Sequence, residues 1–242
     1  MFDMHCHILP EVDDGARSME MALHMLRQAA EEGICAVFLT PHCQPERWGY
    51  DPSILRQKAE LLRQAARQMA ETSDREPIEI YLGTEVRWCP SVPDWLAEGR
   101  CLTMADTDYV LVEFSVRDPL ARIEKALYAL LSLGYCPIIA HVERYESLRH
   151  EVRRIEQWVE EGIRIQSNAS ALAGSDGMMA SLFVHRLMKR GLIHLVGTDA
   201  HTDRWRKPEL QACLAVLEKK YGPGAVQELM EDNPRALLRG EL

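Results

Sequence analysis

The sequence lacks any apolar run that approaches the roughly 20 residues of a membrane-spanning helix. Its amino terminus also lacks a basic segment followed by an apolar one, so we expect no signal peptide. The seven cysteines are scattered and form no CxxC pair, which indicates a reducing compartment. These absences predict a cytoplasmic protein without direct membrane insertion, which can still act beside a membrane-bound partner.

Basic residues are also scarce. The 28 lysines and arginines are outnumbered by 37 aspartates and glutamates, and the formal net charge is −9. We therefore expect no nucleic-acid partner, because binding through backbone phosphates needs a basic face. Metal ions among clustered carboxylates can reverse the local potential, so the net charge does not exclude a phosphate ester as substrate.

Long linkers, low-complexity tracts and internal repeats are absent, so we expect residues 1–242 to form one domain. Short apolar runs alternate with segments of helical period, which predicts an α/β barrel of parallel strands. The predicted strands cover residues 2–5, 35–40, 78–85, 109–114, 137–141, 163–168 and 193–199. The predicted helices cover residues 18–32, 52–72, 92–99, 120–133, 149–161, 178–190, 208–221 and 224–231, the first capped by Ser18 and ended by Gly33. Residues 44–51 and 170–178 are predicted to be loops that border a site.

Histidines and carboxylates gather at the carboxyl ends of these strands, where parallel barrels hold their active sites. His5 and His7 are two residues apart, so both project to the same side of the first strand. Asp199 and His201 repeat this spacing at the last strand. The strand-end residues are His5, His7, His42, Glu85, Glu113, His141, Asn168 and Asp199, and Asp13 and Asp14 follow the first strand in a turn ended by Gly15.

This combination of side chains predicts a metal centre. Imidazoles with carboxylates suit zinc, manganese or iron(II), whereas calcium and magnesium prefer oxygen ligands alone. One HxH pair is weak evidence, but burying so many ionisable groups at one end is costly without a metal or partner. Nine ligands exceed the needs of one ion, so we expect two or three divalent ions, an arrangement suited to hydrolysis by activated water. The nine are His5, His7, Asp14, His42, Glu85, Glu113, His141, Asp199 and His201.

No protein nucleophile is required. We interpret Cys6 and Cys43 as free structural thiols beside ligands, since the CxxxxxR loop of cysteine-dependent phosphatases is absent. Arg144, with Arg204 or Arg206, is placed to bind a phosphoryl group, although surface arginines also pair with neighbouring carboxylates. Loop aromatics beyond the same strand ends line a groove or simply pack; these are Trp48, Tyr50, Trp88 and Trp205.

Taken together, these motifs resemble the PHP (polymerase and histidinol phosphatase) superfamily, and within it the manganese-dependent protein-tyrosine phosphatases of bacterial capsule and exopolysaccharide loci, the CpsB/CapC type. The resemblance spans the chain. It is carried by Asp3-Met4-His5-Cys6-His7-Ile8-Leu9-Pro10, Val12-Asp13-Asp14-Gly15, Glu32-Gly33-Ile34, Thr40-Pro41-His42, Gly83-Thr84-Glu85, Val112-Glu113-Phe114, Ile139-Ala140-His141, Glu143-Arg144-Tyr145, Gln166-Ser167-Asn168-Ala169, Thr198-Asp199-Ala200-His201, Asn233-Pro234 and Leu237-Leu238.

The resemblance implies a distorted (β/α)₇ TIM-like barrel, the PHP fold, with a trinuclear site of manganese, or alternatively iron or zinc. His5, His7, Glu85 and Asp199 would hold the first ion. Glu85 would bridge to a second, completed by Glu113 and His141, and the third would be held by Asp14, His42 and His201. The residues assigned to catalysis are Arg144 and Arg206 as phosphate ligands, Asp199, and His42 or His201 as proton donors through water.

The implied substrate is the phosphorylated tyrosine-rich tail of a membrane-associated bacterial tyrosine autokinase that regulates polysaccharide export. Glu113, where small-molecule PHP phosphatases carry histidine, favours this branch. Val142 stands where the family usually has proline, and Glu11 where it commonly has glycine. Both differences affect the shape of loops rather than the metal ligands.

Three alternatives stay open. A PHP phosphatase for a metabolite such as histidinol phosphate would use the same metals. A non-catalytic regulatory module would be expected to lack ligands, and none is missing. An amidohydrolase would be expected to carry a bridging lysine, where this sequence has Glu85.

Overall fold

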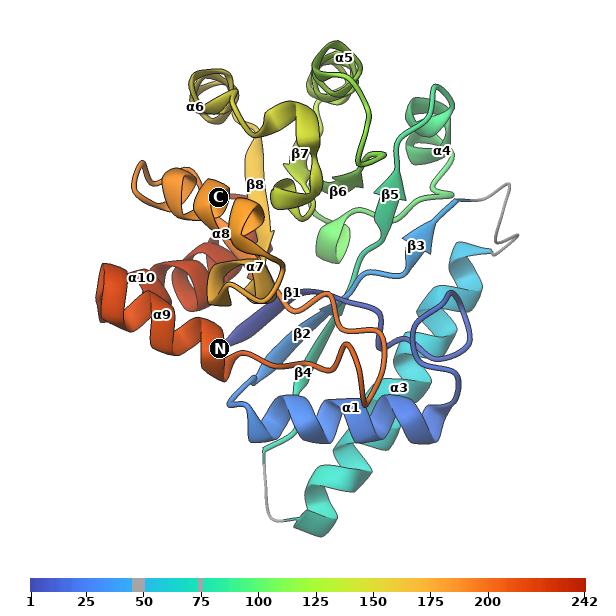
Figure 1. Cartoon of the computed structure of the whole chain (residues 1–242). Coiled ribbons are helices and arrows are strands. Elements are labelled where there is room, and N and C mark those ends of the chain that lie inside the picture. The colour runs from blue at the N-terminus through green and yellow to red at the C-terminus, as the bar shows by residue number, and fades with distance from the viewer. Residues whose placement is uncertain (45–50, 74–75) are drawn as a thin grey trace.

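The centre of the molecule is a curled sheet in which all the strand pairs found among the described residues are parallel (Figure 1). We describe the protein from a computed structural model that covers residues 1–44, 51–73 and 76–242. The strands are β1 (Phe2–Cys6), β2 (Ala36–Leu39), β3 (His42–Cys43), β4 (Glu79–Leu82), β5 (Glu85–Arg87), β6 (Tyr109–Glu113), β7 (Cys136–Ile139), β8 (Arg164–Asn168) and β9 (Leu195–Gly197).

The order of the strands curls the sheet into a distorted barrel. One sheet runs β1-β2-β4 and the other β3-β5-β6-β7-β8-β9, and a bridge between Cys6 and Ala200 brings the chain after β9 beside β1. Two of the seven predicted strand positions are broken, because β2 gives way to β3 at residues 40–41 and β4 to β5 at residues 83–84. The predicted α/β barrel of seven strand positions is confirmed, although the single strand predicted over residues 78–85 is wrong at this break.

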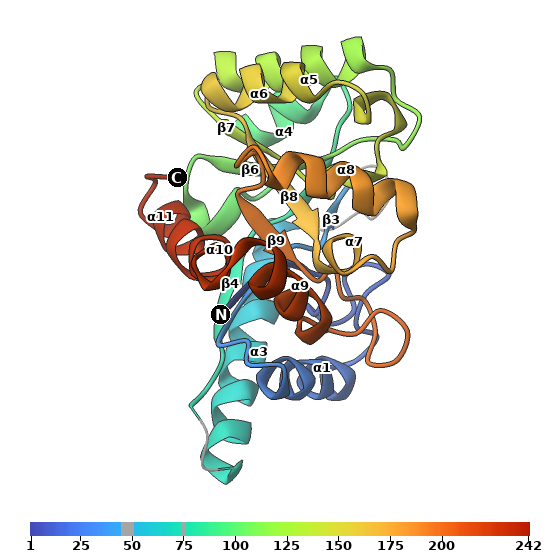
Figure 2. The ribbon, with the colours of Figure 1, turned by 60° about the vertical axis from the view of Figure 1, so that its left-hand side comes forward.

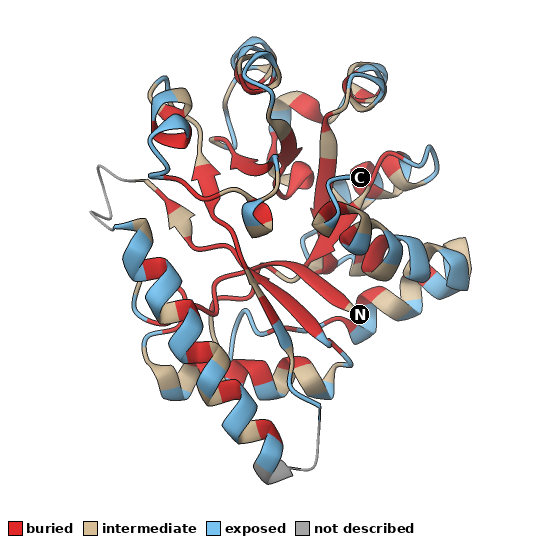
Figure 3. Cartoon of the chain, turned by 180° about the vertical axis from the view of Figure 1, so that it is seen from behind, coloured by how far each residue is buried: buried red, intermediate tan, exposed pale blue. Residues whose placement is uncertain are grey.

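Helices surround the sheet (Figure 2), and their outer faces are exposed while the strands are buried along most of their length (Figure 3). The helices are α1 (Met19–Glu31), α3 (Pro52–Ser73), α4 (Val92–Ala97), α5 (Leu120–Ser132), α6 (Val152–Glu160), α7 (Ala169–Ala173), α8 (Met178–Met188), α9 (Gln211–Tyr221), α10 (Pro223–Gln227) and α11 (Asn233–Leu238). Short turns of other helical types are η1 (Met104–Asp106), η2 (Val142–Arg144), η3 (Glu146–Leu148) and η4 (Glu228–Asp232). No helix of the described residues combines the length and hydropathy needed to cross a bilayer.

The first helix forms as its sequence predicts. The Ser18 hydroxyl accepts a hydrogen bond from the backbone N–H of Met21 at 3.2 Å, which satisfies one free donor of the first turn. Ala22, Leu26 and Ala29 are buried on one face, and Gly33 adopts a left-handed φ of 83° just past the end. This helix therefore packs firmly beside the sheet, with its amino-terminal end near the carboxyl ends of the strands.

Two elements differ from the prediction. Residues 170–178 are not simply a loop, because α7 begins directly after β8; its alanines and leucine favour helix, and Gly174 ends it at a φ of 92°. The single helix predicted over residues 224–231 is instead α10 followed by a π-helical turn, η4, and α11. Pro234 has no N–H to continue the α-helical pattern, which accounts for the wider turn before it.

Candidate metal centre

The nine predicted ligands converge at the carboxyl ends of the strands, so the predicted clustering is confirmed. They come from β1, β3, β5, the end of β6, and the loops that follow β1, β7 and β9. His5, His7, Glu85, Glu113, His141, Asp199 and His201 are buried, His42 is partly buried, and only Asp14 is exposed. Ionisable groups buried in such density are stable only with compensating charges or ions.

Four atoms enclose a small space at the base of the cluster. The Nε2 atoms of His5 and His7 are 3.2 Å apart and lie 3.4 and 3.3 Å from Glu85 Oε2. They lie 3.6 and 3.5 Å from Asp199 Oδ1. A tetrahedron of ligands about 2.1 Å from a metal has edges of roughly 3.4 Å. Five of the six distances among these atoms are close to that value, and His5, His7 and Asp199 form one of the groups of side chains close enough together to hold an ion.

The other oxygen of Glu85 reaches a second group of ligands. His141 Nε2 lies 2.7 Å from Glu85 Oε1 and 3.9 Å from Glu113 Oε2. On the far side, His42 Nδ1 lies 2.9 Å from Glu85 Oε2 and 3.4 Å from Glu113 Oε1. Glu85 thus stands between two groups of ligands, as a bridging carboxylate must.

The outermost group is more open to solvent. His42 Nε2 and His201 Nε2 lie 3.5 and 3.6 Å from Asp14 Oδ1. His7 belongs to the same cluster, with its ring centroid 3.8 Å from that of His201 and 4.6 Å from that of His42. Because Asp14 is exposed, this group of ligands is placed where solvent has access.

Hydrogen bonds at the Nδ1 atoms orient three of the imidazoles toward the cluster. Asp13 accepts a hydrogen bond from His7 Nδ1 at 2.7 Å, and the carbonyl of Asp199 accepts one from His201 Nδ1 at 2.9 Å. Gln166 Oε1 lies 3.4 Å from His5 Nδ1. These contacts at Nδ1 leave each Nε2 facing the cluster, and a neutral ring with its proton on Nδ1 presents there the lone pair that binds metals. The residues present therefore fit metal ions in orientation as well as in type.

Asp13 supports the ligands, a role that the sequence alone does not predict. Besides His7, it accepts hydrogen bonds from the backbone N–H of His42 and of Gly15, each at 2.9 Å. Three donors on one buried carboxylate fix the loop after β1 against the start of β3. Its position beside Asp14 in the turn ended by Gly15 is the only sequence signal that marks it.

The protonation of the histidines reflects the dense negative charge. Burial lowers the pKa of His7, but the carboxylates of Asp13 and Glu85 outweigh this and raise it to about 9. Burial also lowers the pKa of His42, but Glu113 and Glu85 outweigh this and raise it to about 11. Burial and the neighbouring His7 lower the pKa of His201 to about 3. The carboxylates thus hold protons on two imidazoles, which divalent ions would displace on binding.

Two arginines meet at the outer oxygen of Asp199. Arg206 Nη2 lies 2.6 Å from Asp199 Oδ2, and Arg144 Nη2 contacts the same oxygen. Asn168 Nδ2 donates to it at 3.0 Å. Arg144 comes from η2 and Arg206 from the loop after β9, so two guanidinium groups converge from different sides of the cluster. Of the two candidates after His201, it is Arg206 rather than Arg204 that contacts Asp199.

The backbone is strained at two ligands and tight beside two others. His141 and Asp199 adopt left-handed φ angles of 32° and 54°, which non-glycine residues rarely do outside functional sites. A Cβ at Gly197 would lie 2.5 Å from His5 Cβ, and one at Gly15 would lie 2.1 Å from the carbonyl oxygen of His7. Only glycine allows these segments to approach the two histidines so closely.

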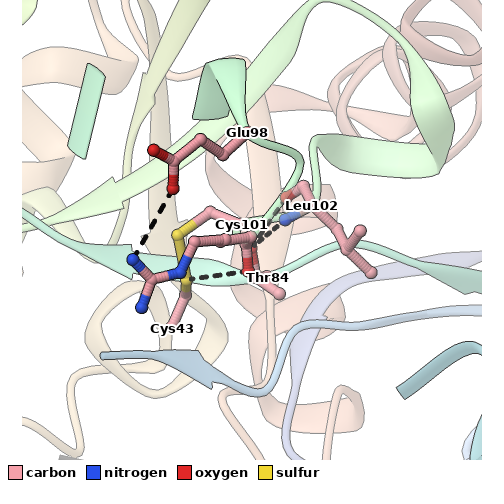
Figure 4. The surroundings of a disulfide bond; sticks show 6 residues. Cys43, Thr84, Glu98, Cys101 and Leu102 are labelled. Carbon is pink, nitrogen blue, oxygen red and sulfur yellow. Dashed lines mark hydrogen bonds and ion pairs between the residues drawn. A yellow bond between two sulfur atoms is a disulfide. The ribbon is translucent and has the colours of Figure 1, made fainter. Parts of the chain in front are cut away.

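Cys43 is not the free thiol that its isolated position in the sequence indicates, and its pairing contradicts the inference of a reducing compartment from scattered cysteines. It forms a disulfide with Cys101, which lies 58 residues away in the sequence, and Figure 4 shows this bond beside Thr84 and Leu102. The Thr84 hydroxyl donates to the carbonyl of Leu102 at 2.7 Å and accepts from its N–H at 3.1 Å. The pairing brings together β3 and the segment before η1, and no local spacing reveals it. The prediction for Cys6 holds, since it is free and buried.

The loop aromatics are divided. Trp88 is partly buried and packs against the main hydrophobic core, whereas the Trp205 side chain is 91% exposed. Trp48 and Tyr50 lie outside the described residues. The two loop tryptophans Trp88 and Trp205 therefore do not form a continuous aromatic groove.

Comparison with known proteins places this site in a family. The sequence profile described as capsular polysaccharide synthesis, CpsB/CapC, matches residues 1–239. The chain belongs to this family. It is 33% identical to the tyrosine-protein phosphatase YwqE of Bacillus subtilis, over 100% of this chain and 92% of that protein. It is 27% identical to the tyrosine-protein phosphatase CpsB of Streptococcus pneumoniae, over 100% of both chains.

A solved structure also supports membership of the CpsB/CapC family. It superposes on this chain with a TM-score of 0.88 and 34% identity, covering 100% of this chain and 96% of the other. It belongs to work on YwqE from Bacillus subtilis and CpsB from Streptococcus pneumoniae, described as unique metal-dependent tyrosine phosphatases. The resemblance inferred from the motifs of the sequence is confirmed.

Proposed function

We propose that this CpsB/CapC protein is a metal-dependent protein-tyrosine phosphatase. The observation that carries this function is the convergence of Arg144 and Arg206 on Asp199 Oδ2, while Asp199 Oδ1 lies with His5 and His7. One carboxylate thus joins a group of metal ligands to a pair of cations that suit phosphate oxygens. Relatives named tyrosine-protein phosphatases support the choice of phosphotyrosine.

We propose three groups of metal ligands, divided as the resemblance to the family implies. His5, His7, Glu85 and Asp199 would hold one ion, and Glu85 with Glu113 and His141 a second. Asp14, His42 and His201 would hold a third. We propose manganese, with iron or zinc as alternatives, because mixed imidazole and carboxylate ligands suit these ions. When bound, the ions would supply activated water and offset the charge that develops on phosphate.

The protein's own groups position the ester. Arg144 and Arg206 would take phosphate oxygens in place of Asp199 Oδ2, and Asn168 would keep that oxygen hydrogen-bonded. We assign His201 to metal binding in preference to proton donation, because the Asp199 carbonyl lies at its Nδ1, and we keep His42 as the candidate proton donor through water. A phenolate is a good leaving group, so tyrosine can depart without a dedicated acid.

The proposed substrate is the phosphorylated tyrosine-rich tail of a membrane-associated bacterial tyrosine kinase that regulates capsule or exopolysaccharide synthesis. The family description, capsular polysaccharide synthesis, supports this setting. A tail phosphorylated at the expense of ATP faces the cytoplasm, so we propose that the protein acts there.

The substrate can be tested against the main rival, a small metabolite. The manganese-loaded protein should hydrolyse a phosphotyrosyl peptide with a higher kcat/KM than histidinol phosphate at matched concentrations. Inactive protein treated with chelator and not resupplied with metal is the control. A more than tenfold preference for histidinol phosphate would contradict the assignment as a tyrosine phosphatase and favour a metabolite phosphatase instead.

A further inference from the structure

Beside the metal centre, a second hollow lies between α1 and the loop that follows β9. Its volume is about 770 Å³, and it is lined by residues of the start of α1 and by Thr202, Asp203, Arg204 and Trp205. A neighbouring hollow of about 500 Å³ contains Arg144, Asp199 and Arg206 and is also lined by Trp205. Trp205 thus stands between the phosphate-binding arginines and the second hollow, which we call the α1 groove.

The loop that carries Trp205 is held in place by hydrogen bonds. The hydroxyl of Thr202 accepts from the backbone N–H groups of Arg204, Trp205 and Arg206 at 3.0–3.3 Å. The N–H groups of His201 and Thr202 donate to the carbonyl of Arg206 at 2.8 and 3.1 Å. These bonds hold the backbone that carries the exposed Trp205 indole, and a large apolar side chain so presented is suited to contact a partner.

Contacts across the groove fix its two walls. Asp203 Oδ2 lies 2.9 Å from His24 Nδ1, and Gln28 Nε2 donates to the carbonyl of Asp203 at 3.0 Å. These bonds tie the loop to α1, and Figure 1 shows the two segments side by side. They also engage both the carboxylate and the carbonyl of Asp203.

The remaining charge of the groove is mainly positive. Arg17, Arg27 and Arg204 line it, and none of the three guanidinium groups has an ion-pair partner within residues 1–44, 51–73 and 76–242. Glu20 is the other carboxylate in the lining. A local excess of cations on a chain with a formal net charge of −9 favours an acidic partner.

We propose that the α1 groove binds an acidic stretch of peptide next to the phosphotyrosine, with Trp205 as the contact between the two hollows. This inference rests on the proposed function. Along α1, Ser18 and Arg27 are separated by about 14 Å, which matches roughly four residues of extended peptide. Acidic side chains there pair with Arg17, Arg27 and Arg204, while the phosphate lies at Arg144 and Arg206. The groove thereby selects among phosphotyrosine sites.

The test compares phosphotyrosyl peptides with four glutamates on the amino side or on the carboxyl side, each matched by a glutamine peptide. At low salt, the manganese-loaded wild type should prefer one glutamate peptide over its glutamine match by at least about fivefold in kcat/KM, and 0.5 M NaCl should reduce this preference. The Arg17→Gln, Arg27→Gln double variant should lose it while hydrolysing free phosphotyrosine as the wild type does. Arg153→Gln, an exposed arginine of α6 away from the groove, is the matched control and should keep it.

The outcomes separate the groove from the proposed function. Equal kcat/KM for glutamate and glutamine peptides in the wild type, with normal turnover of free phosphotyrosine, overturns the groove and leaves the phosphatase assignment standing. A preference that survives in the double variant also overturns the groove. Failure to hydrolyse any phosphotyrosine substrate overturns the proposed function, and the groove with it.

Discussion

Asp13 shows how a single residue that binds no metal can set the affinity of the site. Its carboxylate accepts from His7 Nδ1 and from two backbone N–H groups, so Asp13→Asn places an amide N–H₂ against at least one of these donors. We expect the affinity for manganese to fall by about 10–100-fold, the usual cost of losing such a supporting carboxylate. Titration against a competing chelator measures this.

A suitable control for that variant is Asp108→Asn, which removes the same charge at an exposed position before β6, at the opposite end of the strand from the site. Its manganese affinity should match the wild type. An Asp13→Asn protein that binds manganese as tightly as the control would show that Asp13 does not orient His7.

At the scale of individual residues, the sequence predicts ligands better than their supports. His5 and His7 are recognisable because their spacing puts both on one side of a strand, and Glu85 because it ends a predicted strand. Gln166 lies within a strand, and its link to His5 crosses 161 residues of sequence. Contacts of this kind arise only when the barrel closes, so no local pattern marks them.

The disulfide between Cys43 and Cys101 is the feature that most constrains individual elements, since it ties β3 to the segment before η1. It closes a long loop, so its reduction should cost about 2–4 kcal/mol of unfolding free energy. For a chain of this size that corresponds to a fall of about 5–10 °C in Tm. Thermal unfolding with and without dithiothreitol measures this difference.

The variant Cys101→Ser separates the bond from other effects of the reductant. Its Tm should already be low and should not respond to dithiothreitol, whereas Cys89→Ser, which leaves the disulfide intact, should respond as the wild type does. A wild-type Tm that is the same with and without reductant would count against a stabilising bond. Because Cys43 follows His42 directly, the same experiment reports on the scaffold of the outermost ligands.

Helices and strands with strong periodicity were predictable, and irregular ones were not. The cap at Ser18 and the left-handed Gly33 locate α1 within a residue at each end. The break at residues 83–84 lies inside the single strand predicted over residues 78–85, and the break at residues 40–41 falls at the end of the strand predicted over residues 35–40. These breaks distort the barrel, and they depend on how the strands pair after folding rather than on local preference.

For the whole molecule, the fold and the end that carries the site followed from one rule, that parallel barrels place their active sites at the carboxyl ends of the strands. The division of the surface into a phosphate hollow and the α1 groove could not be predicted from that rule. It depends on the loop of residues 202–207 packing against α1, 179 residues away for the pair His24 and Asp203. Surface relief of this kind is set by tertiary contacts that a periodic pattern does not encode.

We propose that hydrolysis of the phosphate ester depends on two or three divalent ions held through Glu85. The most direct measurement is the number of metal ions bound per chain, followed together with turnover of a phosphotyrosyl peptide while the chelated protein is titrated with manganese. The wild type should gain activity as two or three ions bind, and Glu85→Gln should bind fewer and lose at least about a hundredfold in kcat, since it lacks the bridging charge. Full turnover by the metal-free wild type would contradict a metal-dependent reaction, and full metal content with normal turnover in Glu85→Gln would contradict the bridging role of Glu85.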